Sequence, residues 1–285
     1  MPTRNTVRIL WLALGGALTA LAVAFTTLAA LAEINEPGRI VETTSRSHAL
    51  TSPKVVVRAT GPVDLSIVAG RESRLDVRRE LLWTRNRPVV TERWDGRTLT
   101  VDSRCPGETG ATPATPDDTR DTRGTRGTRG TRDPACRTHY VLTLPATTGV
   151  EAANGDGTVS ATGLRGDLRL AADAGDVIVN GSPRTLRVRV HRGDVIGNDL
   201  RSAESDVETG YGDVILGFTA APAGVRAVVR TAGNIEIRVP DEAGGRGYDV
   251  RTDSGDATVE VRLDPSAPRR ITALTLTGEL RILPS

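Results

Sequence analysis

The chain has 285 residues, with 37 Lys and Arg against 35 Asp and Glu, and this balanced charge does not indicate a nucleic-acid partner. Aromatic residues make up only 3 % of the chain, which disfavours the core of a globular α/β enzyme and favours a thin, aliphatic, all-β core.

The first apolar stretch predicts a membrane segment. Residues 9–32 contain no charged side chain, and a helix of that length spans about 36 Å, enough to cross a hydrocarbon core of ~30 Å. Arg4 and Arg8 precede it, so the positive-inside bias predicts that residues 1–8 are cytoplasmic and that the rest of the chain is extracytoplasmic.

The same stretch has a second interpretation. We expect residues 9–32 to be an uncleaved signal-anchor helix, but Ala30-Leu31-Ala32 fits the cleavage site of a signal peptide, and cleavage there would release a secreted domain. Residues 33–53 contain few apolar side chains together with Pro37, Gly38 and several Ser, so they are predicted to form a stalk.

Short β-branched segments divided by turn signals follow the stalk. Asp95-Gly96, between two of these segments, is typical of a β-hairpin. We interpret the region as an N-terminal β cap, because the open end of a solenoid exposes unpaired strand edges that need covering. The predicted strands are Lys54–Ala59, Val63–Val68, Leu75–Trp83, Val89–Trp94 and Thr98–Asp102.

Cys105 and Cys136 are the only cysteines, and outside the membrane they are most simply a disulfide. A redox or metal pair is the alternative, but CxxC spacing is absent and His139 is the only nearby candidate ligand. Residues 106–135 between them carry Thr-Arg-Gly triplets and are predicted to be a disordered insert. The other interpretation, a row of Arg side chains for a wall polyanion or lipid headgroups, is weakened because five acids balance its five Arg.

A Gly followed by a polar residue recurs every 18–23 residues from residue 155 onwards, and each pair leads into aliphatic residues in alternation. Alternation at period two predicts strands with one buried face, and the recurrence predicts a right-handed β-solenoid over residues 54–285. The predicted corner residues are Gly155, Asp156, Gly175, Asp176, Gly193, Asp194, Gly212, Asp213, Gly233, Asn234, Gly255, Asp256, Gly278 and Glu279. The predicted inward-facing residues are Val177, Val179, Leu186, Val188, Val190, Val214, Leu216, Ile235, Ile237, Val239, Val259, Val261, Leu263, Leu280 and Ile282.

The corner residues have a structural interpretation and two functional ones. We expect each Gly to supply a positive φ and each acid to accept hydrogen bonds from backbone N–H groups. A Ca²⁺ ladder would need GGxGxD at nine-residue spacing, and glycoside hydrolysis would need two acids in different environments. Asn234 and Glu279 occupy the acid position too, so we favour the structural role and predict no catalytic, cofactor-binding or metal-binding residue.

Other catalytic signatures are missing from the sequence. The three His, at positions 48, 139 and 191, are scattered, and GxSxG, P-loop and helix-opening GxGxxG motifs are absent. We therefore expect neither an enzyme nor a cofactor.

Several segments together resemble a known family. They are residues 89–96, residues 99–105, residues 136–145 and the Gly-Asp repeats. Over residues 54–283 the chain resembles the bacterial "putative adhesin" domains of unknown function, β-solenoids of the exported actinobacterial type. The resemblance implies a non-enzymatic envelope domain, and the family supplies no catalytic residues to carry over.

These observations predict a membrane-anchored, extracytoplasmic β-solenoid that serves as an adhesion, scaffold or cell-envelope interaction module. Its expected partners are the membrane and a cell-wall polymer or envelope protein, without nucleic acid or a small-molecule cofactor. Two alternatives stay open at this point: a carbohydrate-active β-helix enzyme acting on wall glycan, and a signalling subunit that relays envelope stress through the anchor.

Overall fold

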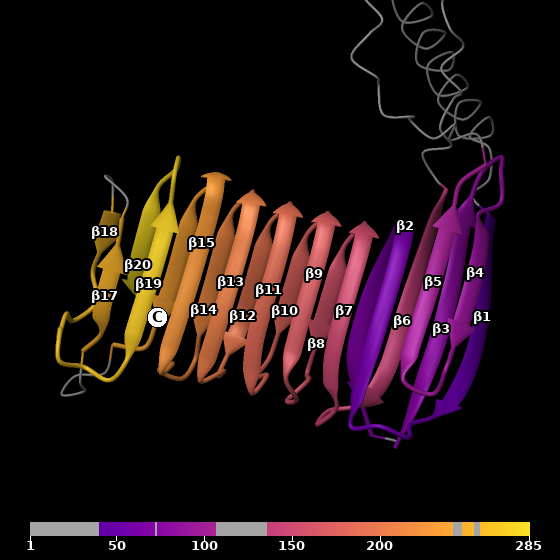
Figure 1. The fold of residues 1–285 in the computed structure, drawn as a ribbon, viewed down its shortest axis with the longest axis horizontal. Coiled ribbons are helices and arrows are strands. Elements are labelled where there is room, and N and C mark those ends of the chain that lie inside the picture. Colours follow the sequence, from indigo (N-terminus) through magenta and orange to yellow (C-terminus); the bar gives the residue numbers. More distant parts are fainter. Residues whose placement is uncertain (1–39, 72, 107–135, 242–246, 254–256) are drawn as a thin grey trace, which may run out of the picture. The chain divides into compact units, whose positions relative to one another are not determined.

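The computed structural model describes residues 40–71, 73–106, 136–241, 247–253 and 257–285, and all the regular secondary structure in them is β (Figure 1). The all-β, solenoid-like architecture predicted from the sequence is confirmed. The predicted cytoplasmic end, the membrane segment 9–32, residues 33–39 and nearly all of the insert lie outside the described residues. Within the described ranges, no helix is long and apolar enough to cross a bilayer.

The chain winds into two sheets that face each other, and one long strand, β2 (Lys54–Gly70), contributes to both of them. We call them sheet A and sheet B. In order of pairing, sheet A contains β1 (Ile40–Ala49), β3 (Arg74–Trp83), β6 (Arg137–Pro145), β2, β8 (Val159–Thr162), β10 (Val177–Asn180), β12 (Val195–Leu200), β14 (Val214–Phe218), β16 (Ile235–Val239), β20 (Leu280–Pro284) and β18 (Ala257–Val259). Sheet B contains β4 (Val89–Trp94), β5 (Thr98–Arg104), β2, β7 (Gly149–Asp156), β9 (Leu168–Ala174), β11 (Thr185–Arg192), β13 (Glu204–Tyr211), β15 (Gly224–Ala232), β19 (Arg270–Thr275) and β17 (Asp249–Thr252).

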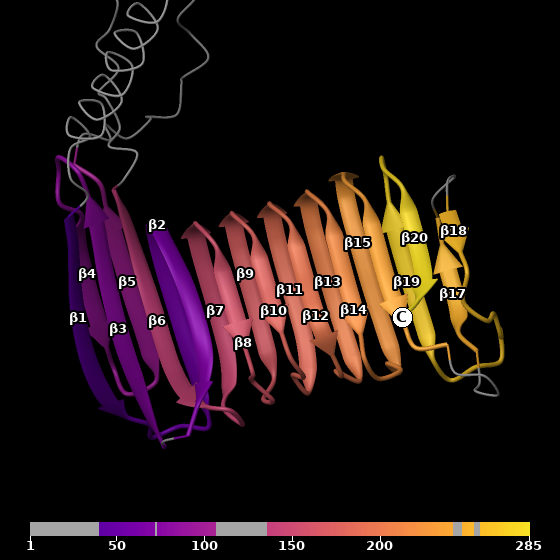
Figure 2. The same cartoon turned by 180° about the vertical axis from the view of Figure 1, so that it is seen from behind.

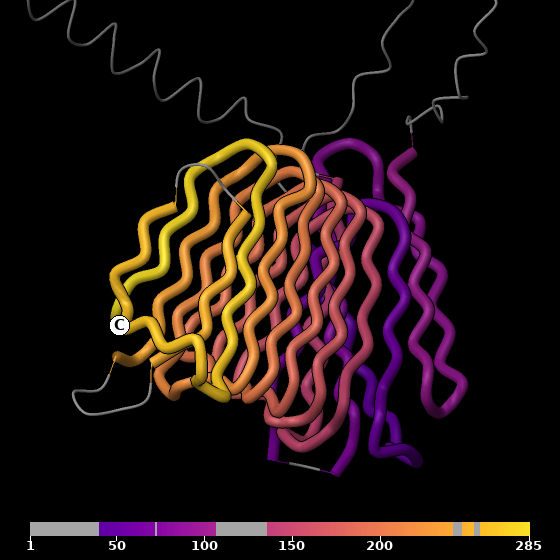
Figure 3. The backbone as a smooth tube through the Cα atoms, turned by 60° about the vertical axis from the view of Figure 1, so that its left-hand side comes forward, coloured from indigo at the N-terminus to yellow at the C-terminus, as the bar shows by residue number. Residues whose placement is uncertain are grey.

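Each turn of the coil contributes one strand to each sheet, so every strand has one face inside the coil and one outside (Figure 3). Inward positions hold aliphatic side chains that stack in register from turn to turn, as in the column through Val177, Val195 and Val214. Of the predicted inward residues, only Leu263 is exposed, at 59 %, while Val259 is half-buried. Both lie in the outermost turn, where no further turn covers them.

The turns do not stack in the order in which they occur in the sequence. Strand β2 lies between the turn formed by β5 and β6 and the turn formed by β7 and β8. At the other end, β19 and β20 lie between the turn of β15 and β16 and the turn of β17 and β18 (Figure 2). The C-terminal edge of both sheets is therefore formed by the two short strands β17 and β18, and short edge strands offer little template for unwanted pairing.

Antiparallel strands close the other end of the coil. Strands β1 and β3 extend sheet A, and β4 extends sheet B. Glu92 of β4 lies in a polar layer there, where its largely buried side chain accepts a hydrogen bond from the Tyr140 hydroxyl at 2.9 Å and pairs with the exposed Arg46 at 3.3 Å. Burial and the adjacent Glu92 charge raise the pKa of Tyr140. This polar layer separates the aliphatic core from solvent, as the terminal repeats of solenoids require.

The predicted stalk is wrong over residues 40–49, which form strand β1 paired with β3. Inward positions of β1 hold His48, Arg46 and Thr44 instead of aliphatic residues, because β1 belongs to the polar layer. The strand therefore lacks the apolar alternation by which strands are recognised in a sequence.

The predicted disulfide is confirmed: Cys105 and Cys136 are joined and both are buried. Cys105 follows β5 in sheet B and Cys136 precedes β6 in sheet A, so the bond bridges the corner of one turn. The insert of residues 106–135 departs from that corner, and the disulfide holds the two strand ends together across it.

One corner of the coil is a column of glycines with φ between 121° and 147°. Its members are Gly157, Gly175, Gly193, Gly212, Gly233 and Gly278. A Cβ atom on Gly175 would lie 2.3 Å from the carbonyl oxygen of Gly157, so both the backbone conformation and the lack of space require glycine. The first predicted corner is displaced, since Gly155 has no positive φ and Gly157 occupies the column instead. Gly255 and Asp256 lie outside the described residues.

The residue after each glycine links its turn to the next one. Oδ1 of Asp176 accepts a hydrogen bond from the backbone N–H of Asp194 at 2.9 Å, and Oδ1 of Asp194 accepts one from Asp213 at 2.8 Å. Oδ1 of Asp213 accepts from Asn234, and Oδ1 of Asn234 accepts from Glu279. The acids were expected to bond within the corners, and the structure shows that they bond between successive corners.

Asp156 does not belong to this ladder. At this corner the N–H of Thr158 donates a hydrogen bond at 2.9 Å to Oδ1 of Asp64, which lies on strand β2 of the preceding turn. Asp64 follows no glycine in the sequence, so the repeat pattern could not reveal it.

The glycine column predicts that replacing Gly175 destabilises the protein more than replacing Gly155 does. Gly175→Ala should lower the free energy of unfolding by at least about 2 kcal/mol, hence the melting temperature by at least about 4 °C, because the added Cβ meets a carbonyl oxygen at a strained φ. Gly155→Ala is the matched control, since its Cβ would have no neighbour closer than 3.6 Å. Thermal unfolding of both variants checks this, and equal effects would contradict the displaced corner.

The hydrogen-bond ladder predicts a difference between two substitutions at one position. Asp194→Ala should cost roughly 1 kcal/mol because the N–H of Asp213 loses its acceptor, whereas Asp194→Asn should keep most of the stability because Asn234 already fills the same role. Chemical denaturation measures both, and a loss on Asp194→Asn as large as that on Asp194→Ala would show that the charge matters and not the acceptor.

Candidate binding surface

Three of the corner acids that the structure describes hold successive turns together. The Oδ1 atoms of Asp176, Asp194 and Asp213 each accept a hydrogen bond from a backbone N–H of the next corner. Among the described residues, no group of three or more His, Cys, Asp or Glu side chains is arranged to hold a metal ion. The three His also lie apart: His48 packs against Trp94, His139 is 3.0 Å from the Ser66 hydroxyl, and His191 is exposed.

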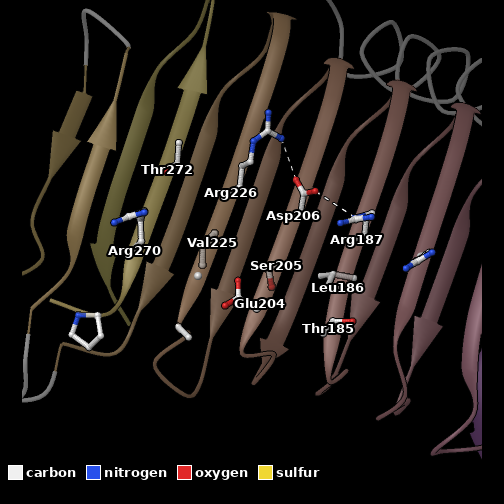
Figure 4. Close-up of a pocket in the computed structure, with 14 residues that line it drawn as sticks. Thr185, Leu186, Arg187, Glu204, Ser205, Asp206, Val225, Arg226, Arg270 and Thr272 are labelled. Atoms are coloured by element: carbon white, nitrogen blue, oxygen red, sulfur yellow. Dashed lines mark hydrogen bonds and ion pairs between the residues drawn. The ribbon is translucent and has the colours of Figure 1, made fainter.

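Charged side chains gather instead on the outer face of sheet B. Because its strands are parallel and in register, outward residues of successive strands form rows across the sheet. One row runs through Arg169 of β9, Arg187 of β11, Asp206 of β13 and Arg226 of β15. Figure 4 shows Asp206 between Arg187 and Arg226, with Arg270 of β19 farther along the same face.

Asp206 and Glu208, two residues apart on β13, are each surrounded by guanidinium groups. Arg226 lies 3.1 Å from Asp206 and 3.4 Å from Glu208, Arg189 pairs with both acids, and Arg230 pairs with Glu208. Burial raises the pKa of Asp206, but the hydrogen bonds and charges of Arg189 and Arg226 outweigh it, so this pKa lies below its ordinary value. The Arg230 hydrogen bond is the main cause of the lowered pKa of Glu208. Both carboxylates are therefore ionised at neutral pH.

Two open grooves lie along this face. One, of 780 Å³, extends over β11, β13, β15 and β19 and is lined by the charged row just described. The other, of 530 Å³, lies where β2, β7 and β9 begin. Arg169 lines both grooves, so the two are neighbours on one surface.

The outer face of sheet A is different. Outward residues of β10, β12 and β14 align Ile178, Ile196 and Ile215, beside Asn180 and Asn198, whose side chains are hydrogen-bonded at 2.9 Å. These positions carry no charge, although the same row continues into Glu236 of β16 and Arg281 of β20, which lie 3.8 Å apart. The two outer faces therefore differ in the middle of the coil, where sheet A presents Ile and Asn side chains and sheet B presents Arg and Asp side chains.

The sequence analysis missed the surface of sheet B. The signal was present in the alternation of β11, where Arg187 and Arg189 take the positions between buried Leu186, Val188 and Val190. Only the register between parallel strands shows which acids these Arg side chains meet.

Two solved structures are similar to this chain at low sequence identity. A "putative cell adhesion protein" from Clostridium sporogenes is 11 % identical with a TM-score of 0.36, and the match covers 86 % of this chain and 100 % of that one. A "putative adhesin" from Bacteroides fragilis is 12 % identical with a TM-score of 0.41, and the match covers 86 % of this chain and 97 % of that one. No curated protein matches the chain.

A family model covers part of the chain. The sequence resemblance described above extends over residues 54–283, and the model covers a narrower stretch, from the end of β6 to the end of β19. Residues 143–275 match the family model described as Toastrack DUF4097.

Proposed function

We propose that this chain is a non-catalytic, membrane-anchored module of the cell envelope whose right-handed β-solenoid binds an envelope component through the outer face of sheet B. The observation that carries the proposal is the network of ion-paired Arg, Asp and Glu side chains on β11, β13 and β15, next to two grooves. A rigid, flat sheet with in-register charged rows suits an extended partner better than a small substrate.

The state of the carboxylates supports binding over glycoside hydrolysis. That reaction needs one protonated carboxylic acid whose pKa is raised, beside one ionised carboxylate. Asp206 and Glu208 both have lowered pKa values because Arg side chains contact them, so neither would hold a proton at neutral pH. We therefore propose that the wall-glycan hydrolase alternative does not apply.

An extracytoplasmic location fits two further features. Residues 9–32 have the length and composition of a signal-anchor with the N-terminus in the cytoplasm, and Cys105 is joined to Cys136. Disulfides persist in oxidising compartments outside the cytoplasm. On this proposal the solenoid lies between the membrane and the wall, and it would be secreted only if the N-terminal segment were cleaved.

Photo-crosslinking in living cells tests which face makes the contact. A photoreactive residue replaces either Ala153 of β7, exposed on the outer face of sheet B, or Thr162 of β8, exposed on that of sheet A, in the full chain. Both positions belong to one turn, so they form a matched pair. We expect adducts with a wall polymer or an envelope protein from position 153, and few from position 162.

Two results would contradict the proposal. If adducts were absent at position 153, or equally abundant at both positions, the outer face of sheet B would not be the binding surface. Release of soluble fragments from purified wall glycan by the full chain would show that the protein is an enzyme.

A further inference from the structure

The groove at the start of strands β2, β7 and β9 carries a charge excess that its own residues do not neutralise. Four basic residues line it, Lys54, Arg165, Arg169 and Arg184, against the single carboxylate of Asp167. Arg184 forms a bidentate pair with Asp167, and Lys54 pairs with Glu151 at 2.5 Å. Both acids already have lowered pKa values because of these partners, so they are ionised and engaged.

Arg165 and Arg169 are the cations of this groove that lack a close ion pair, although the charge of Arg169 also helps to lower the pKa values of Glu151 and Asp167. Both are exposed, and neither forms an ion pair within 4 Å with any residue that the structure describes. Arg169 lies across the sheet from Glu151 and Arg187 in register, so its backbone position is fixed on both sides by neighbouring strands. Two guanidinium groups held on a rigid frame and open to solvent have the donor geometry that phosphate and carboxylate groups accept.

The positive surface continues beyond this groove. Arg169 also lines the larger groove, where Arg187, Arg226 and Arg270 outnumber the two acids Glu204 and Asp206 (Figure 4). The lining holds seven basic residues in the two grooves, with Arg169 counted once, against three acids. Three further acids beside the lining, Glu151, Glu208 and Asp249, pair with Lys54, Arg226 and Arg270, so the excess of positive charge lies at Arg165 and Arg169. Parallel strands are about 4.8 Å apart, so a ligand crossing from β2 to β15 meets cations at intervals along its length.

No aromatic side chain is among the residues that line either groove. Sugar rings are commonly bound by packing on aromatic faces, so recognition here must depend on charge. We infer that these two grooves form one binding site for a linear polyanion, and specifically for a polymer of phosphodiester-linked polyol units. This inference rests on the proposed function and names the ligand class for the face of sheet B.

Direct binding by the full chain in detergent tests the site, with poly(glycerol phosphate) as the probe in titration calorimetry. Replacing Arg165 and Arg169 together by Gln should weaken binding at least tenfold, and raising the salt concentration should weaken the remaining binding further. A second variant, Gly149→Asp, adds a carboxylate to the groove, where its Cβ would have no neighbour closer than 3.7 Å, and should also weaken binding. Unchanged melting temperatures exclude unfolding as the cause.

The matched control is the double variant Arg71→Gln with Arg93→Gln. It removes the same charge from two exposed Arg residues outside both grooves and should change affinity less than twofold. Equal losses in the control and in the groove variant, or no loss in either, would overturn the site.

Three further probes distinguish the source of the anionic groups. Inorganic phosphate alone should bind at least a hundredfold more weakly than the polymer, and equal affinity would overturn an extended site. Binding to phosphatidylglycerol vesicles but not to the free polymer would assign the surface to a lipid membrane, and equal affinity for duplex DNA would overturn the ligand class. If position 153 still crosslinks to an envelope component while the polymer fails to bind, the ligand class is wrong and the proposed function stands.

Discussion

Contact between backbones at the glycine corner is the constraint on which the rest of this structure depends. A Cβ atom at Gly193, Gly212 or Gly233 would lie 2.1–2.2 Å from the carbonyl oxygen of the corner glycine before it. The turns therefore stack on main-chain atoms, and the separation of successive turns does not depend on the size of any side chain. Once this spacing is fixed, inward positions face their equivalents in the next turn, and columns of Val, Leu and Ile fill most of the interior, together with a few buried aromatic residues such as Phe218 and Tyr248.

The acid ladder and the charged face divide the carboxylates of the solenoid into two groups with different tasks. Asp176, Asp194 and Asp213 use a side-chain oxygen to hold the next corner, and Asn234 does the same without a charge. Asp206 and Glu208 point outward and meet several Arg side chains each. The corner residue can therefore be Asp or Asn, as long as an acceptor oxygen remains.

Much of the fold could be predicted from the sequence, because period-two alternation and recurrent glycines report directly on strands and corners. The predicted inward residues from Val177 to Val239 are buried, and the hairpin at Asp95-Gly96 joins β4 and β5. Strand β1 was missed because its inward residues are polar, and the corner at Gly157 was missed because the acid that serves it, Asp64, comes from a strand 94 residues earlier. These contacts connect distant parts of the chain, and a local pattern carries no information about them.

The charged outer face of sheet B could not be predicted from the sequence, for a related reason. Arg169 and Arg187 are 18 residues apart in the sequence and adjacent in the sheet. The partners of Asp206 are likewise distant in the sequence, with Arg189 at a separation of 17 and Arg226 at a separation of 20. Alternation shows that these residues face outward, but not which of them remain without an ion pair. That difference separates Arg165 and Arg169 from Arg184, and it follows from side-chain geometry alone.

The exchanged order of the last two turns determines how this end of the protein can fold. When β17 and β18 leave the ribosome, the strands against which they will finally pair, β19 and β20, have not yet been made. Growth of the coil by successive addition therefore stops at β16, and β17 and β18 can dock only after β19 and β20 have been made. These two turns would then form together, beginning with β19 and β20 on the edge left by β15 and β16.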